Sequence, residues 1–244
     1  MITGRNPVIE AIKSGRALNK IFLQSPAAES ALRNIESMAK SHGIPSLRVE
    51  KAWLDRTAPG NHQGVAALTS IKDYCAVQDI LDCAAERSEA PLIVVADEIL
   101  DPNNLGAIIR SAEAAGAHGV IIPKRNAAGL TDSVSKASAG AVEYMLVSRA
   151  SNVAAVLTEL KKQGVWIIGA DSPGGTAYTE CDYKTATAIV IGGENKGLGR
   201  LVKETCDQIA SLPMRGKIKS LNASAAAAVL LYEALRQRAA AVQP

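Results

Sequence analysis

Aromatic residues are scarce in this chain of 244 residues: they make up 3% of it, and Phe22 is its one phenylalanine. The scarcity disfavours an RNA-binding sheet that stacks bases on rows of aromatic side chains. It also means that the core must be built from Ala, Val, Ile and Leu. Hydrophobic residues make up 48% and charged residues 21% of the chain, so a packed core is expected and wholesale disorder is excluded.

Long apolar runs and paired cysteines are also missing. No run of about 18 apolar residues occurs, and the first residues lack the apolar segment of a signal peptide, so we expect a cytoplasmic protein that does not contact a membrane. The four cysteines form no CxxC pair, and the three histidines lie far from them in the sequence. This spacing predicts neither a metal site nor a disulfide framework.

The two common nucleotide-binding fingerprints are absent. There is no GxGxxG between an expected strand and helix and no GxxxxGK[ST], and the nearest candidate is GGENKGLG at residues 192–199. A standard Rossmann or P-loop enzyme is therefore disfavoured. The net charge of +3 and the pI near 8.6 permit a nucleic-acid partner without requiring one.

Charge is distributed unevenly along a chain whose length fits either one large domain or two smaller ones. Residues 1–71 hold nine Lys/Arg and five Asp/Glu, residues 72–90 hold two and five, and residues 91–244 hold sixteen and fourteen. We interpret the acidic segment 72–90 as a linker or linking helix between a small N-terminal domain and a larger C-terminal one. A solvated surface helix inside one domain is the alternative.

Apolar periodicity predicts α/β structure in both domains. In the N-terminal domain it indicates helices at 6–14 and 28–41 and strands at 20–23, 46–49 and 64–68. In the C-terminal domain it indicates strands at 92–96, 119–122, 165–170, 188–191 and 208–212 and helices at 104–117, 152–163, 198–206 and 221–240. Because apolar strands alternate with helices, we expect a mostly parallel sheet covered on both faces, with ligands beyond the carboxyl ends of its strands.

Polar residues cluster after three of the expected strands. The first cluster, DPNNLGAIIRSA at residues 101–112, begins a capped helix. Arg110 lies about 140° around that helix from Leu105, at about 100° per residue, so it cannot share the buried face. It is either a solvated arginine or a cation that meets a phosphate or ribose at the ligand edge of the sheet.

The other two clusters are a glycine-rich turn and a basic loop. Residues 192–199 hold four glycines, which let the backbone approach a ligand closely, and Glu194 lies among them. Residues 212–224, LPMRGKIKSLNAS, lead into the last helix. Helix capping alone would explain Ser220 and Asn222 there, and a role in a site is the alternative.

Taken together, the three clusters resemble a known family. NLGAIIRSAEAAGA, then IVIGGENKGLGRLVKETCDQIASLPM, then SLNASAAAAVLLYEALRQR resemble, in order and spacing, the three motifs of the SpoU/TrmH branch of the SPOUT RNA methyltransferases. The resemblance covers essentially all of residues 91–240. TGRNPVIEA near the start of the chain and the later HQGV resemble the ribosomal-protein-like substrate-binding domain of the RlmB subgroup, whose members methylate the 2′-hydroxyl of a guanosine in 23S rRNA.

The resemblance implies a fold, a cofactor and a set of site residues. The fold would be an α/β domain with a trefoil knot, which periodicity cannot show, and the cofactor would be S-adenosyl-L-methionine. The residues implied to contact the cofactor are Gly192, Leu212 and Leu221, with Ile191, Met214 and Ala223 beside them. Arg110 would activate the 2′-hydroxyl, within a polar set formed by Asn104, Glu194, Ser220 and Asn222.

The implied role of Arg110 conflicts with the chemistry of a guanidinium, which does not normally accept a proton. We therefore expect Arg110 to stabilise the developing alkoxide or to fix a neighbouring phosphate, with the proton lost to water or phosphate. For RNA capture we expect the basic segment 1–71, with Arg5, Lys13 and Arg16 as candidate phosphate contacts. The resemblance also implies a homodimer that forms through the knot region and the last helix.

Three alternatives stay open. The same 2′-O-methylation could act on tRNA, although the separate N-terminal domain favours rRNA. A non-catalytic RNA-binding or ribosome-assembly protein could keep the fold, although it would have no need of Asn104, Arg110, Glu194 and Asn222 together. An α/β enzyme of another nucleotide is disfavoured by the missing fingerprints.

Overall fold

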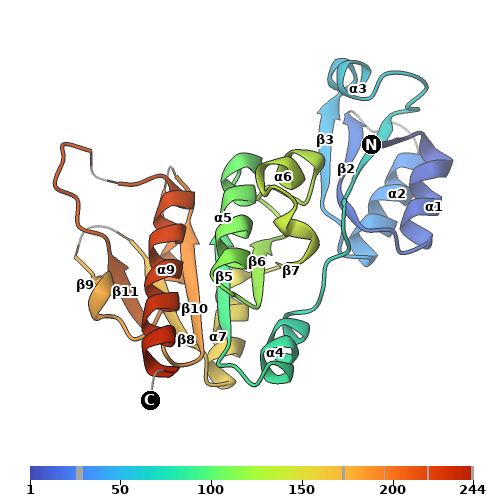
Figure 1. Ribbon diagram of the computed structural model, residues 1–244. Helices are drawn as coiled ribbons and strands as arrows, with labels where there is room; N and C mark the ends of the chain where they lie inside the picture. Colours follow the sequence, from blue (N-terminus) through green and yellow to red (C-terminus); the bar gives the residue numbers. More distant parts are fainter. Residues whose placement is uncertain (26–29, 172–173, 195, 219, 243–244) are drawn as a thin grey trace. The chain divides into compact units, whose positions relative to one another are not determined.

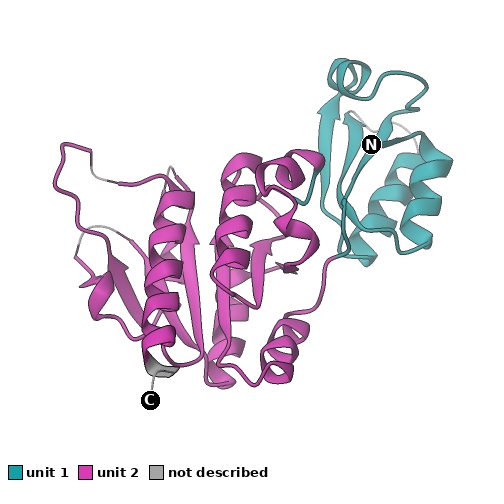
Figure 2. Ribbon diagram, viewed as in Figure 1, with its two compact units in different colours: residues 1–73, 129–131 teal, residues 74–128, 132–244 magenta. Residues whose placement is uncertain are grey.

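The computed structural model describes residues 1–25, 30–171, 174–194, 196–218 and 220–242. The chain divides into two compact units (Figure 1, Figure 2). Unit 1 comprises residues 1–73 and 129–131, and unit 2 comprises residues 74–128 and 132–244. No helix in the described part of the chain is both long and apolar enough to cross a membrane.

Unit 1 is a four-stranded sheet in the order β1-β4-β2-β3, in which β4 is antiparallel to both neighbours and β3 is parallel to β2. Its elements are β1 (Ile2–Thr3), α1 (Arg5–Lys13), β2 (Leu18–Ser25), α2 (Ser30–Ser41), β3 (Ser46–Glu50), α3 (Lys51–Thr57) and β4 (Val65–Thr69). Helices α1 and α2 share one core with the sheet, which includes Ile12 and Ile35. A second, smaller core holds Leu54 of α3 and Phe22, whose ring lies 4.5 Å from that of Trp53.

The sequence predicted most of unit 1. The strands predicted at 20–23, 46–49 and 64–68 and the helix at 6–14 are confirmed with small shifts at their ends. The helix predicted at 28–41 is α2, and residues 28 and 29 lie outside the described residues. β1 and α3 were not predicted, because two residues of strand and seven of helix are too short to show a period.

Unit 2 is built on a seven-stranded sheet in the order β7-β6-β5-β10-β8-β11-β9, with every neighbouring pair parallel. Its strands are β5 (Leu92–Asp97), β6 (Gly119–Pro123), β7 (Leu146–Ala150), β8 (Trp166–Ala170), β9 (Thr176–Ala177), β10 (Thr187–Gly192) and β11 (Gln208–Ser211). After β5 the chain continues to β6 on one side, and after β10 it continues to β11 on the other. The connections therefore diverge between β5 and β10, and ligands of parallel sheets bind at such a point.

Helices cover both faces of this sheet. They are α4 (Val77–Glu86), α5 (Pro102–Ala114), α6 (Asp132–Ala137), α7 (Val153–Lys162), α8 (Arg200–Thr205) and α9 (Ala223–Val242), with short 3-10 helices at Ala141–Glu143 and Tyr178–Glu180. α4, α7 and α8 share a core with alternate residues of the strands, such as Val95 and Val190. α5 packs with α6 and α9 on the opposite face (Figure 1). The predicted parallel sheet with helices on both faces is confirmed.

The acidic segment 72–90 is more than a connector. It contains α4, and Ile80 and Leu81 of this helix are buried in the core of unit 2. The division between the two units falls after Asp73, so most of this segment belongs to unit 2. The acidic side chains lie on the outer side of an amphipathic helix. A charge count registers these side chains and does not register the apolar positions that the helix buries. The helix predicted at 221–240 begins later, at Ala223.

Candidate active site

The second and third polar clusters meet at the carboxyl ends of the central strands. In the sheet register Asp97 at the end of β5 pairs with Gly192 at the end of β10, and Ile191 pairs with Ala170 of β8. The glycine-rich turn follows β10, and the loop after β11 passes beside it. The two clusters thereby form opposite sides of one cavity at the edge of the sheet where ligands were expected.

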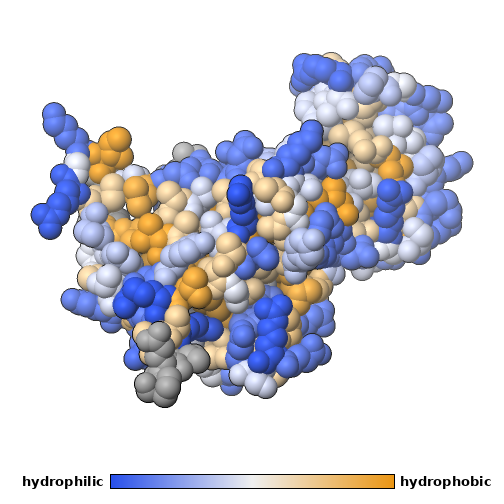
Figure 3. Space-filling model, viewed as in Figure 1, coloured by the Kyte–Doolittle hydropathy of each residue, from blue (hydrophilic) through white to orange (hydrophobic). Residues whose placement is uncertain are grey.

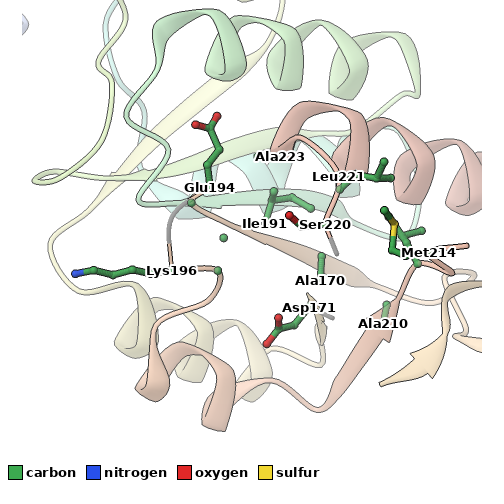
Figure 4. A pocket seen from close by; sticks show the side chains of 15 residues that line it. Ala170, Asp171, Ile191, Glu194, Lys196, Ala210, Met214, Ser220, Leu221 and Ala223 are labelled. Atoms are coloured by element: carbon green, nitrogen blue, oxygen red, sulfur yellow. The ribbon is translucent and has the colours of Figure 1, made fainter. Parts of the chain in front are cut away.

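This cavity, which we call the β10 cavity, has a volume of about 290 Å³ (Figure 4). All six residues that the resemblance implies for cofactor contact line it: Ile191, Gly192, Leu212, Met214, Leu221 and Ala223. Glu194 and Ser220 of the polar set also line it, whereas Asn104, Arg110 and Asn222 do not. The structure thus brings together around one cavity the six residues that the resemblance implies for cofactor contact, while Asn104, Arg110 and Asn222 lie outside its lining.

The glycines of the turn permit close backbone contacts. A Cβ atom on Gly192 would lie 2.3 Å from the carbonyl carbon of Gly197, and one on Gly193 would lie 2.6 Å from the carbonyl oxygen of Glu98. Gly197 has a φ of 62°, in the left-handed region that favours glycine. Its N–H donates to the carbonyl of Gly193 at 2.9 Å, which closes the turn. Side chains at these positions would force the turn apart.

A chain of hydrogen bonds joins the three motifs. Asn104 Nδ2 donates to Glu194 Oε1, and Asn222 Nδ2 donates to Asn104 Oδ1 at 2.9 Å. Asn222 Oδ1 in turn accepts from the backbone N–H of Ser224 at 2.9 Å, which caps the start of α9. Asn222 therefore both caps a helix and joins the polar set. Figure 4 shows the Glu194 carboxylate directed away from Met214 and Leu221.

Helix α5 positions Asn104 and Arg110 differently. Asp101 is its N-cap and accepts from the N–H of Asn103 at 2.9 Å, and proline occupies the first turn. Asn104 is buried with the apolar face of the helix, whereas Arg110 is exposed, as its helical angle predicted. No hydrogen bond or ion pair joins Arg110 to another residue in the described part of the chain. Its guanidinium is available to a substrate.

Asp97 is a buried carboxylate at the end of β5 that contacts the end of the glycine-rich turn. It is buried with 5% of its surface exposed, and burial raises the pKa of its carboxyl, with the neighbouring Glu98 carboxylate adding to the shift. A hydrogen bond from the backbone N–H of Gly199 opposes the shift and lowers the pKa. Asp97 thus links the end of β5 to the chain that leaves the turn.

The sequence interpretation missed Asp171. It lines the β10 cavity directly after β8, and its Oδ2 accepts from Lys203 Nζ at 2.5 Å. Its position directly after a strand could have predicted this place, because polar residues that follow a parallel strand lie at the edge of the sheet where ligands bind. Lys196, in the glycine-rich turn, also lines the cavity, and no sequence motif indicated a role for it.

The three candidate RNA contacts of unit 1 differ in whether their side chains already bond to other residues. The backbone N–H and Nε of Arg5 donate to Gln63 at 3.1 Å each, and Lys13 Nζ pairs with Glu10 at 3.3 Å. Arg16 is exposed, and no described residue pairs with its guanidinium. Of the three cations, Arg16 is therefore the freest to meet a phosphate.

Comparisons with known proteins identify the family. Residues 91–232 match the model of the SpoU rRNA Methylase family, and residues 1–75 match the model named RNA 2′-O ribose methyltransferase substrate binding. The chain is 44% identical over 237 residues to YacO of Bacillus subtilis (strain 168), assigned by name to the TrmH family of tRNA/rRNA methyltransferases. That match covers 97% of this chain and 95% of YacO.

Two solved structures are similar. The SpoU methyltransferase AviRb of Streptomyces viridochromogenes, in complex with AdoMet, matches with a TM-score of 0.63 and 26% identity, over 98% of this chain and 90% of that one. The TrmH/SpoU tRNA modifying enzyme of A. aeolicus matches with a TM-score of 0.58 and 29% identity, over 63% of this chain and 78% of that one. The chain, with its parallel sheet and three joined motifs, belongs to the SpoU/TrmH family of RNA methyltransferases.

Proposed function

We propose that this protein transfers a methyl group from S-adenosyl-L-methionine to the ribose 2′-hydroxyl of a guanosine in 23S rRNA. The observation that supports this best is the hydrogen-bond chain through Glu194, Asn104 and Asn222, one end of which lies at the β10 cavity. A protein that only bound RNA would have no use for a polar chain fixed beside a ligand-sized cavity. The geometry favours catalysis over the non-catalytic alternative.

The β10 cavity fits the proposed cofactor. Its volume of about 290 Å³ is at the lower end of small-molecule sites, roughly 300–1,000 Å³. Ile191, Leu212 and Met214 offer apolar contact, the glycines offer backbone groups, and Asp171 brings a carboxylate. When bound, S-adenosyl-L-methionine supplies a methyl group on a positively charged sulfonium. A partly apolar cavity bordered by the carboxylates of Asp171 and Glu194 suits a ligand that combines a flat adenine with positive charge.

The polar residues would position the ribose. Methyl transfer needs the 2′-oxygen held in line with the methyl group and relieved of its proton, so orientation carries much of the rate. Asn104 holds the carboxylate of Glu194 in one orientation, and Asn222 holds Asn104. Arg110 would stabilise the oxygen as it becomes negative or fix a neighbouring phosphate. The proton would go to water or to a phosphate.

The N-terminal unit supports rRNA over tRNA as the substrate. This chain has a matched substrate-binding region at residues 1–75 and a catalytic region whose family model is named for rRNA. The tRNA modifying enzyme of A. aeolicus matches only 63% of this chain, about the share of the catalytic region. Unit 1 would capture RNA through phosphate contacts, with Arg16 the freest of the candidate cations.

Helix α9 supports the proposed homodimer. Its exposed positions Ala225, Val229, Tyr232 and Leu235 recur at helical spacing and form an apolar stripe. Figure 3 shows apolar surface over this helix. An apolar stripe of this length on the last helix would be covered by the same stripe of a second copy related by a twofold axis.

Methylation assays test the proposal. The protein would be incubated with S-adenosyl-L-methionine carrying a labelled methyl group and, in separate reactions, with 23S rRNA, tRNA and total RNA. We expect label in 23S rRNA, at the 2′-oxygen of one guanosine when the modified nucleotide is mapped. Label in tRNA alone would favour the tRNA alternative. RNA binding without label in any RNA would favour the non-catalytic alternative.

A further inference from the structure

A second cavity adjoins the β10 cavity. It has a volume of about 240 Å³ and is lined by Glu98, Ile99, Leu100, Asn126, Gly193, Glu194 and Lys196. The last three of these residues also line the β10 cavity, so only the glycine-rich turn separates the two spaces. Glu98 follows β5 and Gly193 follows β10, which places this second cavity where the connections of the sheet diverge. We call it the β5 cavity.

Two residues of the β5 cavity have a backbone conformation that is costly for side chains with a Cβ. Glu98 has a φ of 55° and Asn126 a φ of 54°, and such residues persist only where the surrounding structure holds them, often at binding sites. Here the N–H of Ala128 donates to the carbonyl of Ile99 at 2.8 Å, which ties the two loops together. Gly193 fits closely against the carbonyl of Glu98. Both loops are therefore fixed in shape.

The lining combines the groups that recognise a nucleotide. Glu98 is half-buried, and no described residue forms a hydrogen bond or ion pair with its carboxylate. Leu100 is 63% exposed and offers an apolar face for a base. Arg125, next to Asn126 in the sequence, is exposed and offers a cation for a phosphate. Lys196 adds a second cation.

We propose that the β5 cavity receives the base of the target nucleotide and that Glu98 selects guanine. This rests on the proposed function, because it places a base beside the site of ribose methylation. A carboxylate is an acceptor with two oxygens, and the Watson–Crick edge of guanine presents two adjacent donors, N1–H and the N2 amine. Adenine presents an acceptor at N1, which a carboxylate repels. An unpaired target base that is turned out of its stack exposes this edge.

Glu98 fits this role better than the other carboxylate of the cavity. Glu194 accepts a hydrogen bond from Asn104 and belongs to the chain that positions the ribose. Glu98 lies one residue beyond β5, and none of the described residues bonds to its carboxylate, so both of its oxygens are available to a base. The two carboxylates would then have different partners, with Glu194 directed to the ribose and Glu98 to the base.

The test compares the Glu98→Gln variant with the wild-type enzyme on two RNAs. One RNA carries guanosine at the mapped nucleotide, and the other carries inosine, which keeps N1–H and lacks the N2 amine. We expect inosine to lower kcat/KM of the wild type about tenfold and that of Glu98→Gln less than twofold, because the variant has already lost the paired acceptor. On guanosine, Glu98→Gln should lower kcat/KM about 10- to 100-fold, with unchanged affinity for S-adenosyl-L-methionine.

Glu86→Gln is the matched control. It removes the same charge from an exposed position of α4 and should respond to inosine as the wild type does. An equal loss on inosine for wild type and Glu98→Gln, or no loss for the wild type, would overturn the assignment of Glu98. Absence of guanosine methylation by the wild type would instead refute the proposed function, so the two failures are distinguishable.

Discussion

The side-chain oxygen of Asn104 accepts a hydrogen bond from the amide of Asn222 at 2.9 Å, across 118 positions of the sequence. The amide of Asn104 meanwhile donates to Glu194. A single side chain on α5 thus joins the glycine-rich turn to the first turn of α9. Because each amide uses both its donor and its acceptor, neither can rotate without breaking at least two hydrogen bonds. The three motifs act as one structural unit.

Replacing Asn104 should separate turnover from cofactor binding. Asn104→Ala removes the donor to Glu194 and the acceptor for Asn222, and we expect kcat to fall about 10- to 100-fold. Binding of S-adenosyl-L-methionine, measured by calorimetry, should change less than about twofold because Asn104 does not line the β10 cavity. The exposed neighbour Asn103 provides the control. An equal loss of kcat in Asn103→Ala would mean that the hydrogen-bond chain has no special part in turnover.

Replacing Arg110 tests whether its planar guanidinium contacts the reacting ribose. Arg110→Ala should lower kcat about 100- to 1,000-fold, the range seen when one group that stabilises a developing oxyanion is removed. Cofactor affinity should hardly change. Arg110→Lys keeps the charge and loses the fork of donors, so it should restore little of the rate. Near-full turnover of the lysine variant would contradict any role that depends on the fork, and a loss confined to cofactor binding would contradict a role in chemistry.

The glycine-rich turn should not tolerate a methyl group at Gly192. A Cβ atom there would lie 2.3 Å from the backbone of Gly197, so Gly192→Ala must push the turn out of place. We expect its Kd for S-adenosyl-L-methionine to rise at least tenfold in calorimetric titrations. Gly216→Ala is the control, because a Cβ at this exposed glycine meets nothing within 4 Å. Equal Kd values for the two variants would show that the turn does not form the cofactor site.

Stability should fall in mild acid because of His118. This buried ring accepts the N–H of Leu92 at Nδ1 and lies 3.0 Å from Glu89 through Nε2. Burial lowers the pKa of His118, Glu89 opposes that shift, and Arg87 and Arg238 add to it. The pKa in the folded state is thus below its unfolded value of about 6.5, so the unfolded state takes up the proton first. The stability that His118 contributes as a neutral ring is therefore fully present above about pH 6.5, and the free energy of unfolding decreases as the pH falls below that value.

Urea denaturation at pH 7.5 and 5.5 measures this effect. The loss of unfolding free energy between the two pH values should be larger for the wild type than for His118→Asn, in which this group no longer titrates. The same pH dependence in both would rule out His118 as its source.

Charge on the exposed stripe of α9 should prevent dimer formation. Tyr232 is 53% exposed and lies in the middle of the stripe, so Tyr232→Asp would place two carboxylates in the middle of a twofold interface. We expect the wild type to sediment as a dimer at micromolar concentration and the variant as a monomer. Arg200→Asp, at an exposed position of α8, should remain dimeric. A wild-type monomer under these conditions would refute the dimer.

The sequence predicted the helices and strands that have a regular apolar pattern, and it did not predict the contacts between residues that are distant in the chain. The apolar runs of β5, β8 and β10 and the periodicity of α5 predicted the parallel sheet. The residues that the family motifs imply for cofactor contact lie together around the β10 cavity, and their role there stays a prediction. The link from Asn104 to Glu194 spans 90 positions, and no local pattern encodes it. The charge count favours a linker or linking helix at 72–90, because the acidic surface of α4 outweighs its three buried positions, Ile80, Leu81 and Ala84. The β5 cavity could not be predicted, because its lining comes from three separate loops.

The ribosome makes β10 after both of the strands with which it pairs. This strand fills the space between β5 and β8, yet it leaves the ribosome after both of them. Until it arrives, β5 and β8 each present an unpaired edge, and neither cavity can form because the glycine-rich turn is not yet in place. Long-range parallel pairing of this kind is slow to fold. A nascent chain that ends before residue 187 should therefore bind chaperones and no cofactor, and the site should appear only when the last quarter of the chain is complete.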